Sequence, residues 1–194
     1  MKISPVQFSY DTDAVSQRQF DEHIKLYKGY VDKTNSVTQE LSQNGGQNQA
    51  NSAYSLYRGL KEGESFVLSG TILHEMYFQN MTAHPSTPCE KTRMILEDSF
   101  GSFDNWLVDF KACATAARGW CILSYEQRTK TFRNIMLDTH DTGSVIGMYP
   151  LLILDMYEHA YFLDYGTDKA SYIGKFISSI NWNVISTRLK ALMV

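Results

Sequence analysis

A short apolar run that ends in a carboxylate constrains this fold more than any other feature. Residues 149–155 read "YPLLILD", and "MYEHAYF" follows directly. A continuous apolar run of this length, bounded by polar residues, is typical of a central, buried strand. Burying a charged group is costly unless the group is paired or bound to a metal. Asp155 and His159, spaced D-x-x-x-H, therefore need partners that the rest of the fold must supply.

The first half of the chain predicts an antiparallel helical hairpin. Residues 16–42 contain no proline and a single glycine, and Ser16 is a suitable N-cap. The polar stretch 44–52, with paired glycines, interrupts the helical pattern. A second helix is expected over about residues 64–81. The buried face of the first helix is expected to consist of Phe20, His23, Tyr27, Tyr30, Val31 and Thr34.

The second half predicts a mixture of helices and strands. Residues 120–138 contain two β-rich runs around a polar turn, as a hairpin does. Ser102 is expected to cap one helix, and Gly119 is expected to end it. Four helices are predicted, over residues 90–100, 102–119, 168–180 and 183–193. The expected fold class is α+β, with a helical hairpin followed by a three-stranded antiparallel sheet flanked by helices.

A proline-containing segment separates the two halves. Residues 82–90, "TAHPSTPCE", hold two of the four prolines and form the best linker candidate. We therefore expect a helical hairpin domain at residues 1–84 and an α+β domain at residues 85–194. At 43% hydrophobic residues, the chain can build a proper core.

Composition excludes several classes of partner. A net charge of −3 argues against nucleic acid or an anionic membrane surface. No apolar run approaches the ~20 residues of a membrane span, and the N-terminus lacks the apolar core of a signal peptide. Cys89, Cys113 and Cys121 are odd in number and form no C-x-x-C pair. We expect a reducing compartment, the cytoplasm, with the cysteines as packing residues.

The histidines are the main candidates for chemistry. His84 lies in the linker and is expected to be exposed. A single buried histidine is usually a core residue with satisfied hydrogen bonds. Spacing alone leaves that interpretation open, because it does not show that the two halves of the chain converge. The alternative is a metal site with nitrogen and oxygen donors suited to iron, manganese or zinc, formed by His23, His74, Asp155 and His159.

Nearly the whole chain resembles the iron/manganese superoxide dismutase family. "DMYEHAYFLDY" is similar to the family's Asp-x-Trp-Glu-His-Ala-Tyr-Tyr segment, and "NWNVISTRL" resembles its C-terminal Asn-Trp helix. "SFGSFDNWLVDFKACATAARGW" resembles the family's Ser-Phe-Gly-Ser-Phe segment, the following helix and the Gly-Trp of the first strand. "SQRQFDEH" and "LHEMYFQNM" resemble the segments that carry its first and second metal ligands.

The resemblance implies a metal site and a reaction. The implied reaction converts two superoxide ions to dioxygen and hydrogen peroxide while one iron or manganese ion per subunit is reduced and reoxidised. Gly70 departs from the commonest iron pattern, and Ile153 matches neither metal's usual residue, so a site that works with either metal is expected. The implied ligands, two from each half of the chain, are His23, His74, Asp155 and His159.

The resemblance also implies roles for residues around the metal. His140 stands where manganese members carry Gln, and it would hydrogen-bond the solvent molecule on the metal; the alternative is an ordinary loop histidine. Gly70 stands where many iron members place Gln, which fits a donor supplied by His140 instead. Trp120 matches the first pocket tryptophan, whereas Ile122 replaces the second and Tyr157 replaces the hallmark tryptophan.

Three positions depart from the family pattern near the entrance of the site. Tyr27 takes the position of a second histidine, and Val31 takes that of the gateway tyrosine. Tyr30, one residue earlier, is expected to substitute at the gateway. Phe162 replaces the tyrosine that in the family reaches the histidine of the partner subunit.

Glu158 implies a homodimer, or a tetramer built from dimers. In the family, the glutamate beside the last ligand crosses a two-fold axis and bonds the ligand histidine of the other subunit. The alternative is an exposed acid in the first turn of a helix. A second function also stays open, because the altered entrance favours a metal-binding family member with impaired activity that serves as an interaction protein. A zinc hydrolase is disfavoured, since no separate general base stands out.

Overall fold

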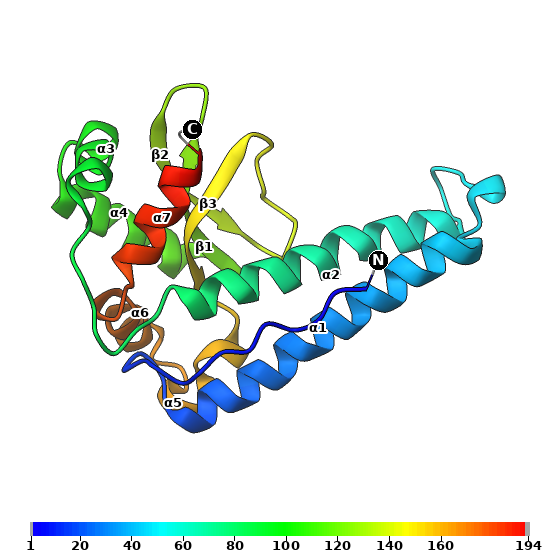
Figure 1. Ribbon diagram of the computed structural model, residues 1–194, viewed down its shortest axis with the longest axis horizontal. Coiled ribbons are helices and arrows are strands. Elements are labelled where there is room, and N and C mark those ends of the chain that lie inside the picture. The colour runs from blue at the N-terminus through cyan, green and yellow to red at the C-terminus, as the bar shows by residue number, and fades with distance from the viewer. Residues whose placement is uncertain (1, 193–194) are drawn as a thin grey trace.

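The computed structural model describes residues 2–192, which form a projecting helical hairpin and a compact α+β body (Figure 1). The hairpin consists of helices α1 (Gln17–Asn44) and α2 (Leu56–Gln79), with a short 3-10 turn at Gln47–Gln49 between them. The body contains helices α3 (Glu90–Phe100), α4 (Phe103–Ala116), α5 (Phe162–Tyr165), α6 (Lys169–Ser178) and α7 (Trp182–Leu192), and strands β1 (Trp120–Glu126), β2 (Thr131–Leu137) and β3 (Met148–Asp155).

The sheet confirms the predicted α+β class. Its strands are antiparallel in the order β2-β1-β3, so β1 is the central strand. Helix α4 packs against β1 and β2, whereas α2 and α7 pack against β3. The prediction of a central strand over "YPLLILD" is therefore wrong. β3 is an edge strand, and its apolar residues are buried because helices cover it. The edge position also accommodates Pro150, which has no N–H to donate to a ladder.

The helix starts follow the expected capping chemistry. The Ser16 side chain accepts a hydrogen bond from the Gln19 amide, and that of Ser102 accepts one from the Asn105 amide. Side-chain oxygens at these positions satisfy amides that have no partner within the helix. The predicted face of α1 is confirmed, since Phe20, His23, Tyr27, Val31 and Thr34 are buried and Tyr30 is partly buried.

Two helix boundaries differ from the prediction. Helix α2 begins at Leu56, eight residues before the expected start, with Ser55 as its N-cap. Helix α4 ends at Ala116 rather than at Gly119. Gly119 instead directly precedes β1, and its amide donates to the Leu137 carbonyl. A Cβ at this position would lie 2.9 Å from that carbonyl oxygen, which explains the glycine.

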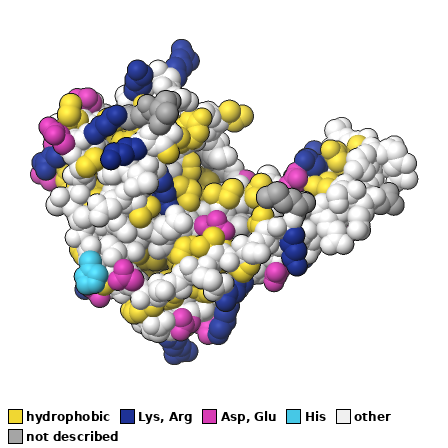
Figure 2. Space-filling model, in the orientation of Figure 1, with side chains coloured by type: hydrophobic (Ala, Val, Ile, Leu, Met, Phe, Trp, Pro, Cys, Tyr) yellow, Lys and Arg dark blue, Asp and Glu magenta, His cyan; other side chains and the backbone are white. Residues whose placement is uncertain are grey.

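The outer end of the hairpin is mostly polar (Figure 2). Buried side chains on α1 end at Thr34, and those on α2 begin at Val67. Beyond these points the two helices rest mainly on each other. The inner part of the hairpin packs against the body and contributes His23 and His74 to its interior. No helix among residues 2–192 has an apolar stretch long enough to cross a membrane.

Candidate metal centre

Four side chains from four segments converge where the hairpin meets the body. His23 lies on α1, His74 on α2, Asp155 at the end of β3, and His159 in the 3-10 turn Glu158–Ala160. One donor atom from each residue lies within 4.8 Å of the others. Tertiary contact between α2 and β3 and between α1 and the 3-10 turn produces this convergence.

One carboxylate oxygen stands at the centre of the group. Asp155 Oδ2 lies 3.2 Å from His23 Nε2, 3.6 Å from His74 Nε2 and 3.2 Å from His159 Nε2. Donors bound to one ion at ~2.0–2.2 Å are themselves ~3–3.5 Å apart, so the spacing matches a shared ion. The His159 nitrogen can hydrogen-bond this oxygen, but one oxygen cannot satisfy three imidazoles.

Buried nitrogens without hydrogen-bond partners support a metal. His23 Nε2 and His74 Nε2 are buried, yet neither makes a hydrogen bond of acceptable geometry, although His23 Nε2 lies near Asp155 Oδ2. Buried polar atoms are nearly always satisfied in folded proteins. The His74 Nδ1–H donates to the Gly70 carbonyl at 2.6 Å, which leaves the Nε2 lone pair directed at the site. The donor set therefore fits a cation.

The electrostatics of the group agree with this fit. Burial would raise the pKa of the Asp155 carboxyl, but the nearby imidazoles of His159 and His23 outweigh it and lower the pKa. Burial lowers the pKa of His74 to about 3 and lowers that of His23 as well. An ionised carboxylate thus faces the neutral imidazoles of His23 and His74, the states in which both residue types bind metals.

The neighbours of Asp155 hold it in place. Its Oδ1 accepts from the Tyr157 amide at 2.9 Å, and its carbonyl accepts from the Tyr172 hydroxyl at 2.9 Å. Tyr157 also stacks on His159 with ring centroids 5.1 Å apart. Tyr157 therefore supports both the carboxylate and one imidazole, from the position implied for the hallmark tryptophan.

A second chain of hydrogen bonds runs beside the four candidate ligands. Trp120 Nε1 donates to His140 Nδ1 at 3.0 Å, so the proton of this imidazole resides on Nε2. His140 Nε2 lies 2.6 Å from the Tyr30 hydroxyl oxygen and donates to it. Burial lowers the pKa of His140 to about 4 and raises that of Tyr30. The sequence therefore identified the members of this chain, but their connections emerge only in the fold.

Gly70 provides room for this chain. A Cβ at Gly70 would lie 2.9 Å from Tyr30 Cδ1 and 3.1 Å from His140 Cδ2. Such contacts are closer than carbon atoms normally approach, so both rings would have to move. The association of Gly70 with His140 that the sequence suggested thus has a steric basis.

We expect Gly70→Ala to weaken the Tyr30–His140 bond and to destabilise the protein by about 1–3 kcal/mol, the usual cost of overpacking. Gly63→Ala on the same helix is the matched control, because a Cβ there meets nothing within 4 Å. That control should stabilise the protein by about 0.5–1 kcal/mol. Urea unfolding measures both changes in stability. Equal behaviour of the two variants would contradict the steric argument.

The other implied neighbours lie apart from one another. Tyr27 is fully buried; its hydroxyl donates to Glu75 Oε1 at 2.7 Å and accepts from the Val6 amide at 2.8 Å. Phe162 is 47% exposed, and Glu158 is exposed beside His159. Tyr27 is therefore occupied within its own chain, whereas Phe162 and Glu158 face outward. His84 is exposed, as expected.

Three positioning residues escaped the sequence analysis. Gln19 Nε2 donates to the His159 carbonyl at 2.6 Å, and Asn80 Oδ1 accepts from the Ile153 amide at 2.8 Å. Glu75 bonds Tyr27. A polar side chain one helical turn before His23 was the available signal for Gln19, and adjacency to His74 was the signal for Glu75.

A hollow opens next to two of the candidate ligands. It is lined by Arg18, Gln19, Glu22, His23, Leu26, Glu158, His159, Phe162 and Leu163. Leu26, Phe162 and Leu163 are exposed apolar side chains, which is unusual for three neighbours on one surface. The hollow therefore combines access to the site with an apolar rim.

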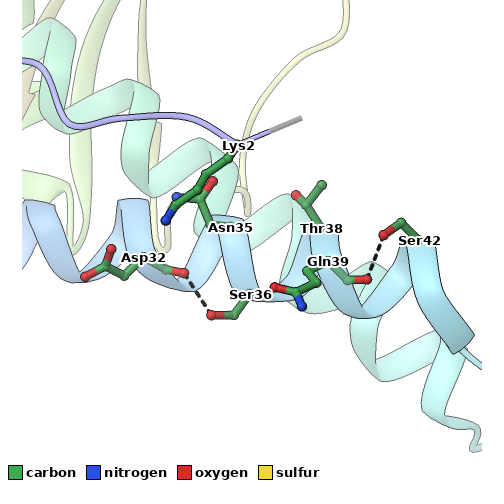
Figure 3. Close-up of a pocket in the computed structure, with 7 residues that line it drawn as sticks. All are labelled: Lys2, Asp32, Asn35, Ser36, Thr38, Gln39 and Ser42. Atoms are coloured by element: carbon green, nitrogen blue, oxygen red, sulfur yellow. Dashed lines mark hydrogen bonds between the residues drawn. The ribbon is translucent and has the colours of Figure 1, made fainter.

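A different hollow on the hairpin lacks the features of a metal site (Figure 3). Its lining is Lys2, Asp32, Asn35, Ser36, Thr38, Gln39 and Ser42. Ser36 Oγ donates to the Asp32 carbonyl and Ser42 Oγ to the Gln39 carbonyl, so these hydroxyls serve their own helix. Asp32 is the single carboxylate among the lining residues. Among residues 2–192, the group of side chains that could hold a metal ion is the four-residue cluster.

Comparison with known proteins agrees with this geometry. The family model for iron/manganese superoxide dismutases, C-terminal domain, matches residues 88–188. The chain is 35% identical to a superoxide dismutase [Fe] of Aquifex pyrophilus over 93% of its own length and 87% of the relative. It is 32% identical to a superoxide dismutase [Mn] 1 of Halobacterium salinarum over 97% of its length and 94% of the relative. Relatives named for either metal thus align along most of the chain.

Proposed function

The chain belongs to the iron/manganese superoxide dismutase family, and we propose from this premise that it converts superoxide to dioxygen and hydrogen peroxide. One iron or manganese ion would be held by the four clustered residues. The observation that carries the assignment is the buried donor set itself, in which two imidazole nitrogens lack any other partner. When bound, the ion supplies one-electron redox chemistry.

The residues around the ion have separate tasks. Asp155 provides the negative charge, and Tyr157 and Tyr172 hold it in place. His140 and Tyr30 hold a proton on a partly buried hydrogen bond beside the ligands, which suits a reaction that consumes protons. Trp120 fixes the tautomer of His140. Tyr30 would therefore take the gateway role in place of Val31, which favours catalysis over the alternative of a binding protein with impaired activity.

Metal analysis together with superoxide consumption tests the proposal. The purified protein is expected to contain about one iron or manganese ion per chain and to consume superoxide, whereas the chelated protein should not. A full complement of iron or manganese without consumption would favour the binding protein. Zinc in the site with no redox activity would favour a hydrolase.

We propose further that the protein is a homodimer, or a tetramer of such dimers. Within residues 2–192, His159 Nε2 faces Asp155, so Nδ1 is left for an acceptor outside the chain. A ligating histidine normally donates its second N–H to an outer partner, often a carboxylate. Glu158 is exposed beside it, and an isologous contact would satisfy both sites at once. The apolar rim of Leu26, Phe162 and Leu163 would be covered in the same contact.

We expect Glu158→Ala to produce a monomer with reduced metal retention. The chain has Tyr27 and Phe162 in place of the family's bridging histidine and tyrosine, so the interface should depend more heavily on Glu158. Sedimentation at micromolar concentration and metal content measure the result. Glu97→Ala is the control, because Glu97 forms an exposed bridge to Arg93 on α3. A monomeric wild type, or a variant that stays dimeric with full metal, would contradict the proposal.

Two broader assignments accompany this function. We propose a reducing compartment, the cytoplasm, because the three cysteines are free thiols. We also propose the division into domains at residues 1–84 and 85–194, with two ligands from each. The family model for the C-terminal domain, which starts at residue 88, supports that boundary.

A further inference from the structure

Two of the three cysteines meet on the face of the sheet that α4 covers. Cys121 is buried in the central strand β1, and its thiol donates to the Phe110 carbonyl of α4 at 3.7 Å. Helical side chains tilt toward the N-terminus and lie over the preceding turn. Cys113 follows Phe110 by about one turn of α4, so its side chain extends toward the same carbonyl. The Cys113 and Cys121 side chains are therefore neighbours, each shifts the pKa of the other thiol, and both thiols are free.

The environments of the two thiols differ. Cys113 is partly exposed, whereas Cys121 is fully buried. The neighbouring Cys121 side chain lowers the pKa of the Cys113 thiol. Burial raises the pKa of the Cys121 thiol. A small oxidant from solvent would therefore meet Cys113 first, with Cys121 in reach as the second thiol.

We propose that Cys113 and Cys121 are a redox-active dithiol that hydrogen peroxide oxidises to a disulfide joining α4 to β1. This proposal rests on the proposed function for its oxidant, because dismutation of superoxide releases hydrogen peroxide. The Cys113 thiolate attacks one peroxide oxygen, the O–O bond breaks, and a sulfenic acid and hydroxide form. The hydroxide takes a proton from Cys121 and becomes the first water. The Cys121 thiolate then displaces the sulfenic oxygen as hydroxide, which takes up the proton that Cys113 released and becomes the second water. Overall, two thiols and one peroxide give one disulfide and two waters.

The position of the pair links it to the site. Cys121 directly follows Trp120, whose indole donates to His140 Nδ1. A covalent bond from α4 to the adjacent residue would hold this part of β1 against the helix. The oxidised protein should therefore unfold at a higher temperature than the reduced one, since a cross-link restricts the unfolded chain.

Cys89 provides an internal control. It is exposed at the N-cap of α3, where hydrogen bonds involving Ser186 and Thr92 lower the pKa of its thiol to about 7. Its neighbours are hydroxyls, so peroxide would convert it to oxyacids or join it to another molecule. The expectation that all three cysteines are packing residues is wrong for Cys89 and incomplete for the other two.

Peptide mapping of the metal-loaded protein tests the proposal. Wild type and Cys89→Ser are treated with a small excess of hydrogen peroxide, alkylated and digested with trypsin. Cleavage after Lys111, Arg118 and Arg128 places Cys113 and Cys121 in separate peptides. We expect both proteins to yield these two peptides as a pair, two hydrogens lighter than their sum and separated by dithiothreitol. Cys113→Ser, with Cys113→Ala as a second variant, should yield none and lose the rise in unfolding temperature.

A second arm separates this proposal from the proposed function. The peroxide is generated by the protein from a superoxide source, with or without catalase. If the disulfide forms with added peroxide but not from superoxide, the result supports the redox-active dithiol and contradicts the proposed dismutation. Cys113 and Cys121 both alkylated after peroxide, with oxidation confined to Cys89, would overturn the dithiol.

Discussion

Replacing Asp155 with asparagine is expected to remove the metal and the activity together. The loss of superoxide consumption should be on the order of 10³-fold, larger than the ~10–100-fold cost of changing an outer partner of a ligand. Asp155 supplies the only carboxylate of the four clustered side chains, and its Oδ2 is nearest to three imidazole nitrogens. An asparagine keeps the shape but leaves a cation without an opposing charge.

The apoprotein distinguishes this explanation from a loss of folding. Without a cation, wild-type Asp155 is a buried carboxylate whose neighbours His159 and His23 favour its ionised form. Apo Asp155→Asn should therefore still fold, somewhat less stably than apo wild type, while the stabilisation on adding iron or manganese disappears. Calorimetry with and without metal measures both quantities. Asp168→Asn is the control, because Asp168 is an exposed N-cap of α6 and asparagine caps equally well. A variant that retained one ion per chain would refute the assignment.

The parts of the fold that depend on local chemistry could be predicted. Ser16 and Ser102 cap helices by bonding amides three residues away, and these signals are complete within a few residues. The start of α2 was missed because Gly59 and Gly63 weaken the helical pattern there. Contact between the two helices overrides that weakness and extends α2 to Leu56. The edge position of β3 likewise depends on strand order, which periodicity does not encode.

In the candidate site, too, local sequence predicted some features, whereas tertiary contacts determined the others. Asp155 and His159 were recognisable as a pair because they are four residues apart. Their convergence with His23 and His74 depends on packing between segments distant in sequence. The supporting bonds made by Gln19 and Asn80 span 140 and 73 residues, so a local pattern can mark a polar residue as a candidate but cannot indicate its partner. Residue identity thus suggested the ligands, but tertiary contact determined which polar residues orient them.

Replacing His140 with alanine should lower turnover by about 10²-fold while the protein keeps its metal. This loss is at the low end of the range for removing a positioned proton donor. His140 contacts Tyr30 and Trp120 through its ring nitrogens and is not one of the four clustered residues. His140→Gln should retain much of the activity, because an amide N–H can still donate to the Tyr30 hydroxyl. Unchanged turnover in His140→Ala would assign His140 to the loop alone.

The hydrogen bond between His140 and Tyr30 allows a double-variant test of whether the two residues act together. If the two residues act through one bond, Tyr30→Phe should cost about as much as His140→Ala, and the double variant should cost little more than either. Independent roles would instead multiply the two losses. Burial lowers the pKa of His140 from 6.5 to about 4, so the imidazole stays neutral with Nε2 protonated as the pH falls through 6.5. Titration of His140 should therefore cause no inflection near pH 6.5 in the wild-type activity profile. The profiles of wild type and His140→Gln should agree in this range. An inflection near pH 6.5 that is present in wild type and absent in His140→Gln would show that His140 acts on the reaction other than through Tyr30. Losses that multiply in the double variant would show the same.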